Sequence, residues 1–561
     1  MCRAILLALL LGAAQAASGQ EVSDIRDLVP RSIEYGGHSE LFTEAYTVNG
    51  RQARRPSGTA RLLLRPYMRI GETFELTANV LLSTEQRSFG GDGRQKINRI
   101  GITPAWGWGS AQLGDFNYAY TPLTYEGIPM RGGALHLEPG WLRFSALGGV
   151  TQRAVAGDAS NGSYGRQLYA GRIGVGQTDG SWFDLIALYA DDDEGSLQSE
   201  PFYDEDDSTL VGTVAPTSIT PQENLVLGAA TQISAFARKL VWSGEFAGSA
   251  YTRDKRAREV DDSSSLDIPV WLSSVFTPRI GTSLDYAWST DLRLRVPRWD
   301  LSGEYKYVGP GYRSLGVGSL LVDRRVLRGR AAFQSRTVTG SVNASLQRDN
   351  VLGQKLDTTR RNALGSIVSY RPRRNLLTTL QATFSTMLRN TSAPDQRIDY
   401  LSQVYGAGAR LSLRRRWVRS VGLDYRLQKA DDANPVRSSS GFLSHQLTAP
   451  VGLQLTDALH LTPNVGVVFV RHPVDGWRTT HTERLTLRHS GMARRWVSTF
   501  TVGTSFDEGT RRLVLSANSN LRVSERSRLR LVLRNNDFRA RQEAGSDWSE
   551  FIARLSLETR W

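Results

Sequence analysis

Arginine is the residue type in this sequence whose spacing points to chemistry. The chain has 69 lysine and arginine residues against 55 acidic ones, and all but six of these cations are arginine. A guanidinium group is always charged and binds carboxylates and phosphates through a rigid fork of donors. Near the C-terminus, arginines recur at alternate positions with leucines between them. The candidate anion-binding residues are Arg512, Arg522, Arg526, Arg528, Arg530, Arg534 and Arg554.

Two interpretations of these arginines are open. They could give a pore a cationic lining, which would raise the local concentration of anionic solutes or of a polyanionic polymer. In the alternative, they pair with carboxylates such as Glu245, Asp424 and Glu558, and the arginines in turns contact lipid phosphates. The net charge of +14 is compatible with either interpretation.

Acidic residues are concentrated between positions 191 and 207, where we expect a loop. Carboxylates are oxygen ligands for Ca²⁺, but their spacing here does not match an EF-hand loop. A solvated loop is the favoured interpretation, and we expect no metal site. The weak calcium candidates are Asp191, Asp192, Asp193, Asp206 and Asp207.

Residues for catalysis do not occur in a recognisable arrangement. No pair among the seven histidines has the spacing of a helical zinc motif, and the chain has no GxSxG nucleophile elbow. Cys2, the only cysteine, lies in a segment that we expect to be removed. We therefore predict no catalytic residues, no enzyme activity and no cofactor, and we expect no nucleic acid as a partner.

The N-terminus has the features of a cleavable signal peptide. Arg3 is followed by an apolar run and by a small-x-small triplet that ends at Ala16. The run is shorter than the ~20 apolar residues that a membrane-spanning helix needs. We expect residues 1–16 to be removed and residues 17–33 to form a short periplasmic tail, which is too short for a globular plug.

The rest of the chain, residues 34–561, alternates between apolar and polar positions. In the segment 337–347, every even-numbered residue is apolar or glycine and every odd-numbered residue is polar. This period of two is typical of β-strands with two different faces. The alternating runs predict an all-β fold, although a β-sandwich array would show the same alternation. The links between the runs favour a single large antiparallel transmembrane β-barrel of about 26 strands (range 22–28). Tight turns alternate with longer polar links, of which residues 191–221 and 252–279 are the notable extracellular loops.

Tryptophans give a second indication of a membrane. Aromatic residues collect at the two interfaces of a membrane barrel, where their rings sit at the level of the lipid headgroups. Nine of the 13 tryptophans lie beside tight turns that we assign to the periplasmic side, and we expect them to form one interfacial belt. They are Trp106, Trp108, Trp141, Trp182, Trp242, Trp299, Trp417, Trp496 and Trp561.

Glycines are frequent between residues 113 and 141, where they permit a bulge or a close approach of two backbones. The chain could bend inward here and narrow the lumen, although ordinary barrel strands are the favoured interpretation. The segment resembles a glycine-aspartate-aromatic stretch of uncharacterised outer-membrane proteins from Bacteroidota-like bacteria. That resemblance implies no function.

The last 11 residues alternate up to the end of the chain. The apolar set is Phe551, Ala553, Leu555, Leu557, Thr559 and Trp561. This pattern resembles the C-terminal β-signal of bacterial outer-membrane proteins, which ends on a terminal aromatic residue. The resemblance implies insertion by the barrel assembly machinery, contact with outer-membrane lipid and a location in the bacterial outer membrane. Any periplasmic partner would be a separate chain.

Two functions fit these features. The first is a porin-like channel or an exporter barrel that passes anionic solutes or a polymer through an arginine-rich lumen. The second is a non-conducting scaffold or adhesin of the outer membrane that acts through its extracellular loops. A channel predicts an open lumen lined by arginine and asparagine, whereas a scaffold predicts a lumen closed by loops that fold inward.

Overall fold

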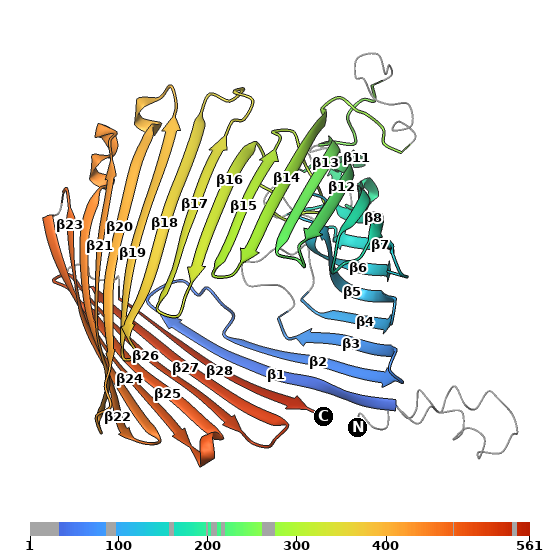
Figure 1. The fold of residues 1–561 in the computed structure, drawn as a ribbon. Coiled ribbons are helices and arrows are strands. Elements are labelled where there is room, and N and C mark those ends of the chain that lie inside the picture. Colours follow the sequence, from blue (N-terminus) through green and yellow to red (C-terminus); the bar gives the residue numbers. More distant parts are fainter. Residues whose placement is uncertain are drawn as a thin grey trace, which may run out of the picture.

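The computed structural model describes residues 33–85, 97–155, 162–197, 200–203, 210–214, 219–260, 275–474, 476–540 and 547–561. They form an antiparallel sheet of 26 strands that closes on itself. The ring closes because β1 (Ile33–Asn49) pairs with both β2 (Gly58–Ile70) and β28 (Trp548–Arg560), as Figure 1 shows. The predicted barrel of about 26 strands is confirmed. The expected signal peptide and residues 17–32 of the expected tail lie outside the described residues.

The remaining strands of the wall follow one another around the ring. They are β3 (Phe74–Ser83), β4 (Arg99–Trp106), β5 (Gly109–Thr121), β6 (Tyr125–Leu137), β7 (Leu142–Gln152), β8 (Gly165–Gly176), β9 (Trp182–Asp193), β12 (Glu223–Ala235), β13 (Leu240–Thr252), β14 (Thr282–Val296), β15 (Trp299–Val308), β16 (Arg324–Gln334), β17 (Val338–Asp349), β18 (Thr358–Arg373), β19 (Leu376–Asn390), β20 (Ile398–Ser412), β21 (Val418–Asp432), β22 (Phe442–Thr456), β23 (Leu459–His472), β24 (Gly476–Gly491), β25 (Trp496–Phe506), β26 (Thr510–Arg522) and β27 (Ser527–Ala540).

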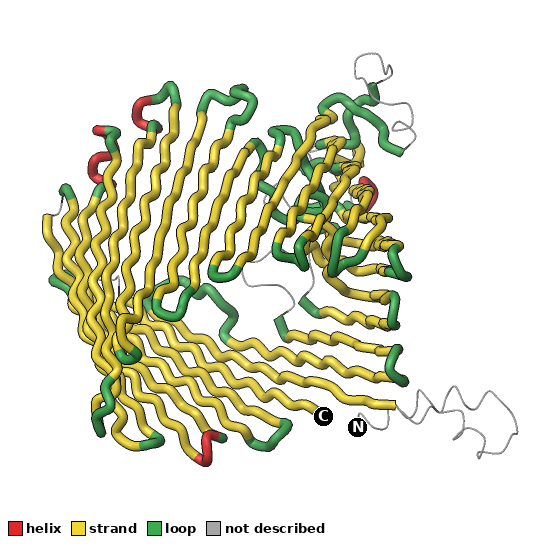
Figure 2. The backbone as a smooth tube through the Cα atoms, viewed as in Figure 1, coloured by secondary structure: helices red, strands yellow, loops and turns green. Residues whose placement is uncertain are grey.

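Two kinds of short element lie outside the wall. A hairpin of β10 (Glu200–Tyr203) and β11 (Leu210–Val214) lies in the link between β9 and β12. Short 3-10 turns, visible at the strand ends in Figure 2, are η1 (Glu194–Ser196), η2 (Pro394–Gln396), η3 (Pro435–Ser440) and η4 (Met492–Arg494).

The wall has two chemically different faces, because alternate side chains of a strand point to opposite sides. On β17, Val342 and Leu346 are exposed on one face. Leu346 is in register with Leu327 of β16, so the apolar face continues from strand to strand. Exposed apolar surface costs about 25 cal/mol per Å² in water. The apolar face is therefore the lipid face, and the face with Asn343 lines the lumen.

The two ends of the barrel differ in the length of their links. At the short-turn end, every link has two to five residues, as at 107–108 and 297–298. At the long-loop end, links reach 29 residues, at 194–222 and 253–281. All the predicted tight turns lie at the short-turn end.

The glycine-rich segment forms wall strands that also bend into the lumen. β4 pairs with β5 only up to Gly114, and β7 pairs with β6 only up to Arg131. Among the described strands, residues 116–130 therefore pair only with each other, while Glu126 also forms a bridge to Val317 in the link between β15 and β16. Gly114 has a φ of +93°, and a Cβ on Gly132 would collide with the carbonyl oxygen of Gly148. Glycine permits this bend because a side chain would block it.

The link 309–323 between β15 and β16 also folds inward and packs on this hairpin. The buried Tyr312 donates its hydroxyl hydrogen to the carbonyl oxygen of Leu123 at 2.7 Å. The backbone N–H of Glu126 donates to the carbonyl oxygen of Gly316 at 3.0 Å. We call residues 115–130 and 309–323 the inner shelf. With the wall it buries one cluster, Leu123, Tyr125, Met130, Leu147, Leu168, Ala170, Leu188, Ala190, Val226, Ala247, Ala287, Val308 and Tyr312.

Because Gly37 lies where the ring closes, we predict that a larger side chain at this position destabilises the barrel. Gly37 and Trp561 exchange two backbone hydrogen bonds, and a Cβ on Gly37 would lie 2.5 Å from Cζ2 of the Trp561 ring. Gly37→Val should displace this ring and destabilise the barrel by about 1–3 kcal/mol. The measurement is the temperature at which the folded band is lost in semi-native gel electrophoresis. The control is Gly329→Val, where a Cβ meets no atom within 4 Å. Equal unfolding temperatures for the two variants would contradict the prediction.

Candidate functional site

The outer surface defines the class of the protein before any site is considered. In the described part of the chain, no helix is long and apolar enough to span a membrane. A closed ring of 26 antiparallel strands leaves no unpaired sheet edge, and its lipid face carries exposed apolar side chains such as Leu380 and Val465. Strands cross a bilayer only in such closed rings. The protein is a β-barrel of the bacterial outer membrane.

The nine tryptophans singled out in the sequence all lie at the short-turn end, in short links or near the adjoining strand ends. Trp108, Trp141 and Trp417 are more than half exposed. Their role as an interfacial belt stays a prediction.

Most of the candidate arginines share the lumen face of the last three strands. Arg522 is in register with Arg528, and Arg534 is in register with Ile552. These positions alternate with Leu531, which is exposed on the lipid face. Arg512, Arg522, Arg528, Arg530, Arg534 and Arg554 therefore line the lumen. Arg526 lies instead in the link 523–526 at the short-turn end.

Among the candidate arginines, Arg554 differs from the others because it forms an ion pair. Arg554 donates to Oε2 of Glu44 at 2.5 Å. Within the described residues, the other six candidate arginines form no ion pair. The expected acidic partners Glu245, Asp424 and Glu558 form none there either. Glu245 instead accepts a hydrogen bond from the backbone N–H of Leu123 on the inner shelf, at 3.0 Å.

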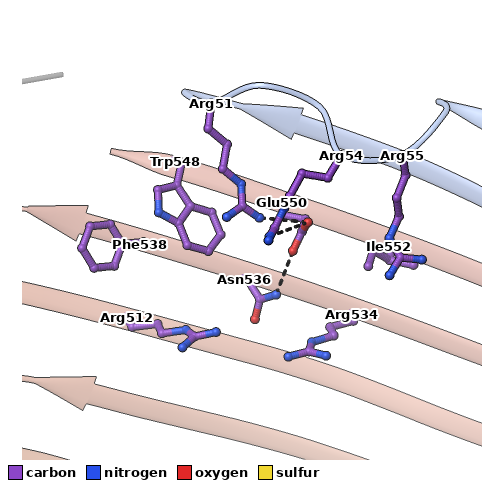
Figure 3. A pocket seen from close by; sticks show the side chains of 10 residues that line it. All are labelled: Arg51, Arg54, Arg55, Arg512, Arg534, Asn536, Phe538, Trp548, Glu550 and Ile552. Atoms are coloured by element: carbon purple, nitrogen blue, oxygen red, sulfur yellow. Dashed lines mark hydrogen bonds and ion pairs between the residues drawn. The ribbon is translucent and has the colours of Figure 1, made fainter. Parts of the chain in front are cut away.

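A cavity of about 620 Å³ lies at the long-loop end of these strands. Arg51, Arg54 and Arg55 enter it from the link 50–57, and Arg512 and Arg534 enter it from β26 and β27 (Figure 3). We call it the mouth cavity. Five guanidinium groups thus meet in one space.

Glu550 is the one acidic side chain among the described residues that line the mouth cavity. Its carboxylate pairs with Arg51 at 2.9 Å and with Arg54 at 3.6 Å. It also accepts hydrogen bonds from the hydroxyl of Tyr46 at 3.1 Å and from Nδ2 of Asn536 at 3.2 Å. The cavity therefore keeps a large excess of positive charge.

A second cavity, of about 740 Å³, continues along the same wall. It shares Arg512 and Arg534 with the mouth cavity and adds Arg484 together with polar side chains such as Asn464 and Thr482. We call the lumen face of β22 to β28 the arginine wall. Its guanidinium, hydroxyl and amide groups can donate hydrogen bonds to an anion in the lumen.

Charges on the opposite side of the barrel are neutralised. Arg143 pairs with Asp184 at 2.8 Å, and both side chains are almost fully buried. Arg166 pairs with Asp192 at 2.6 Å. Within the described residues, the lumen thus has one wall on which most of the candidate arginines form no ion pair and an opposite wall of compensated ion pairs.

Three of the five calcium candidates lie in the described part of the chain, and each of them interacts with a group of the protein. Asp191 pairs with Lys255, Asp192 pairs with Arg166, and Asp193 accepts a hydrogen bond from the N–H of Gly195 at 3.0 Å. No group of three metal-ligating side chains occurs in the part of the chain that the structure describes. Asp206 and Asp207 lie outside it.

Sequence reasoning missed the three arginines of the link 50–57 and Glu550. Arg51, Arg54 and Arg55 lie in a link and not on an alternating strand, so a period of two cannot find them. The basic run that they form was the available signal.

Comparisons with known proteins do not assign this chain to a family. No protein-family model matches the sequence, and no curated protein is similar to it. The siderophore receptor PirA from Pseudomonas aeruginosa is a similar solved structure, with 10% identity, 94% of this chain and 80% of that chain covered, and a TM-score of 0.37. A BenF-like porin from Pseudomonas fluorescens Pf-5 has 9% identity, 94% and 99% coverage and a TM-score of 0.30. Such low scores carry no inference about function.

Asn224 holds the link 309–323 of the inner shelf, and we predict that its substitution loosens this link. This fully buried side chain donates from Nδ2 to the carbonyl oxygen of Arg313 at 3.1 Å and accepts from the N–H of Leu315 at 2.9 Å. Asn224→Ala should leave buried polar groups of the link without partners, at a cost of about 1–3 kcal/mol. Trypsin should then cleave the folded protein after Arg313 faster than wild type. The control is Asn343→Ala, at an exposed lumen position of β17. Unchanged cleavage in Asn224→Ala would contradict this anchoring role.

Proposed function

We propose that the protein is an anion-selective channel of the outer membrane, which passes anionic solutes or an anionic polymer along the arginine wall. The observation that carries the proposal is the absence of ion pairs, within the described residues, for Arg512, Arg522, Arg528, Arg530 and Arg534. Unpaired guanidinium groups in a water-filled lumen attract anions and exclude cations. We assign the protein no catalytic step.

Barrel dimensions support a path for solutes. With strands about 4.8 Å apart and tilted by about 40°, a circular ring of 26 strands is about 50 Å across. The inner shelf covers the inner face of strands between β5 and β15. Arg512, Arg528 and Arg530 stay exposed on the other side. At physiological salt, the field of exposed charges is screened over about 8 Å. Anions close to the arginine wall should therefore feel it most strongly.

The inner shelf also favours a second candidate function. Segments that fold inward are what a non-conducting scaffold or adhesin requires, since such a protein acts through its extracellular links. Under this alternative, the barrel would insert stably and conduct no ions.

We also propose a partner for the insertion of the barrel into the outer membrane. The lipid-facing side chains Phe551 and Leu555 of β28 are exposed, as is Trp561 directly after the strand. We propose that the barrel assembly machinery recognises this strand and that a periplasmic partner, where one exists, is a separate chain.

The channel proposal predicts the ion selectivity of the purified protein. In planar bilayers with a salt gradient, the reversal potential should indicate preference for chloride over potassium. R528Q/R530Q should reduce this preference about two- to fivefold, because both residues face the lumen and form no ion pair in the described part of the chain. R511Q/R539Q is the matched control, since this registered pair lies on the lipid-facing side of β26 and β27. Stable insertion without conductance would contradict the channel proposal. The scaffold or adhesin would then be the remaining candidate function.

A further inference from the structure

We propose that the mouth cavity is a binding site for a phosphate-type oxyanion, either hydrogen phosphate or the phosphate group of a larger solute. The inference deepens the proposed function and rests on it only for the route by which the ligand arrives. The chemistry of the site is set by its own side chains.

Charge is the first argument. Arg51, Arg54, Arg55, Arg512 and Arg534 line the cavity, and Glu550 is the one carboxylate among its described lining residues. Arg55 is also paired outside this set, with Glu44 at 3.2 Å. Mutual repulsion of the remaining guanidinium groups is relieved when a multiply charged anion enters.

The positions of Arg512 and Arg534 are the second argument. Figure 3 shows their side chains extending toward each other from neighbouring strands. Neither forms an ion pair in the described part of the protein. Each guanidinium can therefore present two parallel N–H groups to the oxygens of one anion, which is the geometry that phosphate accepts. Chloride, a single spherical atom, gains no such bidentate contact.

Asn536 supplies the third argument, because its side chain would favour the binding of hydrogen phosphate over sulfate. The residue is only 3% exposed and lines the cavity. Its Nδ2 donates to Glu550, which fixes the orientation of the amide. Its Oδ1 is buried and has no hydrogen-bond partner. A buried acceptor without a donor is costly. Hydrogen phosphate carries a P–OH group that can donate to it, whereas sulfate has no proton to give.

The remaining lining residues hold the arginines in place. The Arg51 guanidinium lies 3.7 Å from the centre of the Trp548 ring, and Glu550 fixes its other side. The Trp548 ring stacks on Phe538 with 5.8 Å between ring centres. This apolar floor excludes water on one side and so strengthens the electrostatic attraction for a bound anion.

Titration calorimetry of the full-length protein in detergent and chloride buffer tests the site, with inorganic phosphate and sulfate as probes. Wild type should bind phosphate, and sulfate should bind at least fivefold more weakly. R512Q/R534Q should weaken phosphate binding at least tenfold. R511Q/R539Q should leave it within twofold of wild type, since these arginines lie at the same end of the same strands on the opposite face. Heat-dependent mobility in semi-native gels confirms that each variant is folded.

The outcomes separate the two proposals. No phosphate binding by wild type, or equal weakening in both double variants, overturns the site even where the barrel conducts anions selectively. Equal affinity for phosphate and sulfate overturns the role of Asn536. Phosphate binding that depends on Arg512 and Arg534, in a protein that inserts without conductance, supports the site and refutes the channel.

Discussion

The pairing of β1 with β28 is the contact on which the rest of the structure depends. An unpaired strand edge inside a bilayer leaves its N–H and C=O groups without partners, at several kcal/mol each. The ring therefore has to close between residues near opposite ends of the chain, as Gly37 and Trp561 do. Closure also fixes the register, and a shift by one residue would turn every side chain of a strand to the other face. Leu531 faces lipid and Arg530 faces the lumen for this reason.

The two sides of the lumen handle charge in opposite ways. Near the inner shelf, Arg143 and Asp184 are withdrawn from water, and a buried charge without a partner would be strongly destabilising there. Along the arginine wall, Arg528 and Arg530 are exposed and can remain hydrated, so they need no carboxylate. The cost of leaving them unpaired is therefore small. Positive charge can be retained on this wall without a large loss of stability.

The parts that were predictable from the sequence depend on local periodicity. Alternation along 337–347 and 551–561 reports which face each residue occupies, so the strands and the lumen position of Arg528 could be predicted. Contacts between distant segments leave no such signal. The Arg554–Glu44 pair spans most of the chain and exists because the ring closes. The mouth cavity likewise needs the link 50–57 to lie beside β26 and β27, which alternation within a strand does not reveal.

The position of the inner shelf follows from the lumen face of the wall beneath it. On β7, β8 and β9 that face carries Leu147, Leu168 and Leu188, which would meet water in an uncovered barrel. Covering them is favourable at about 25 cal/mol per Å², and the bend at Gly114 lets the β5–β6 hairpin reach them. On β22 to β28 the same face is mostly polar and cationic, apart from a small apolar area around Phe538 and Trp548, so burial of this face would be unfavourable. The apolar side of the lumen is therefore filled, and any aqueous path is confined to the side that carries the arginines.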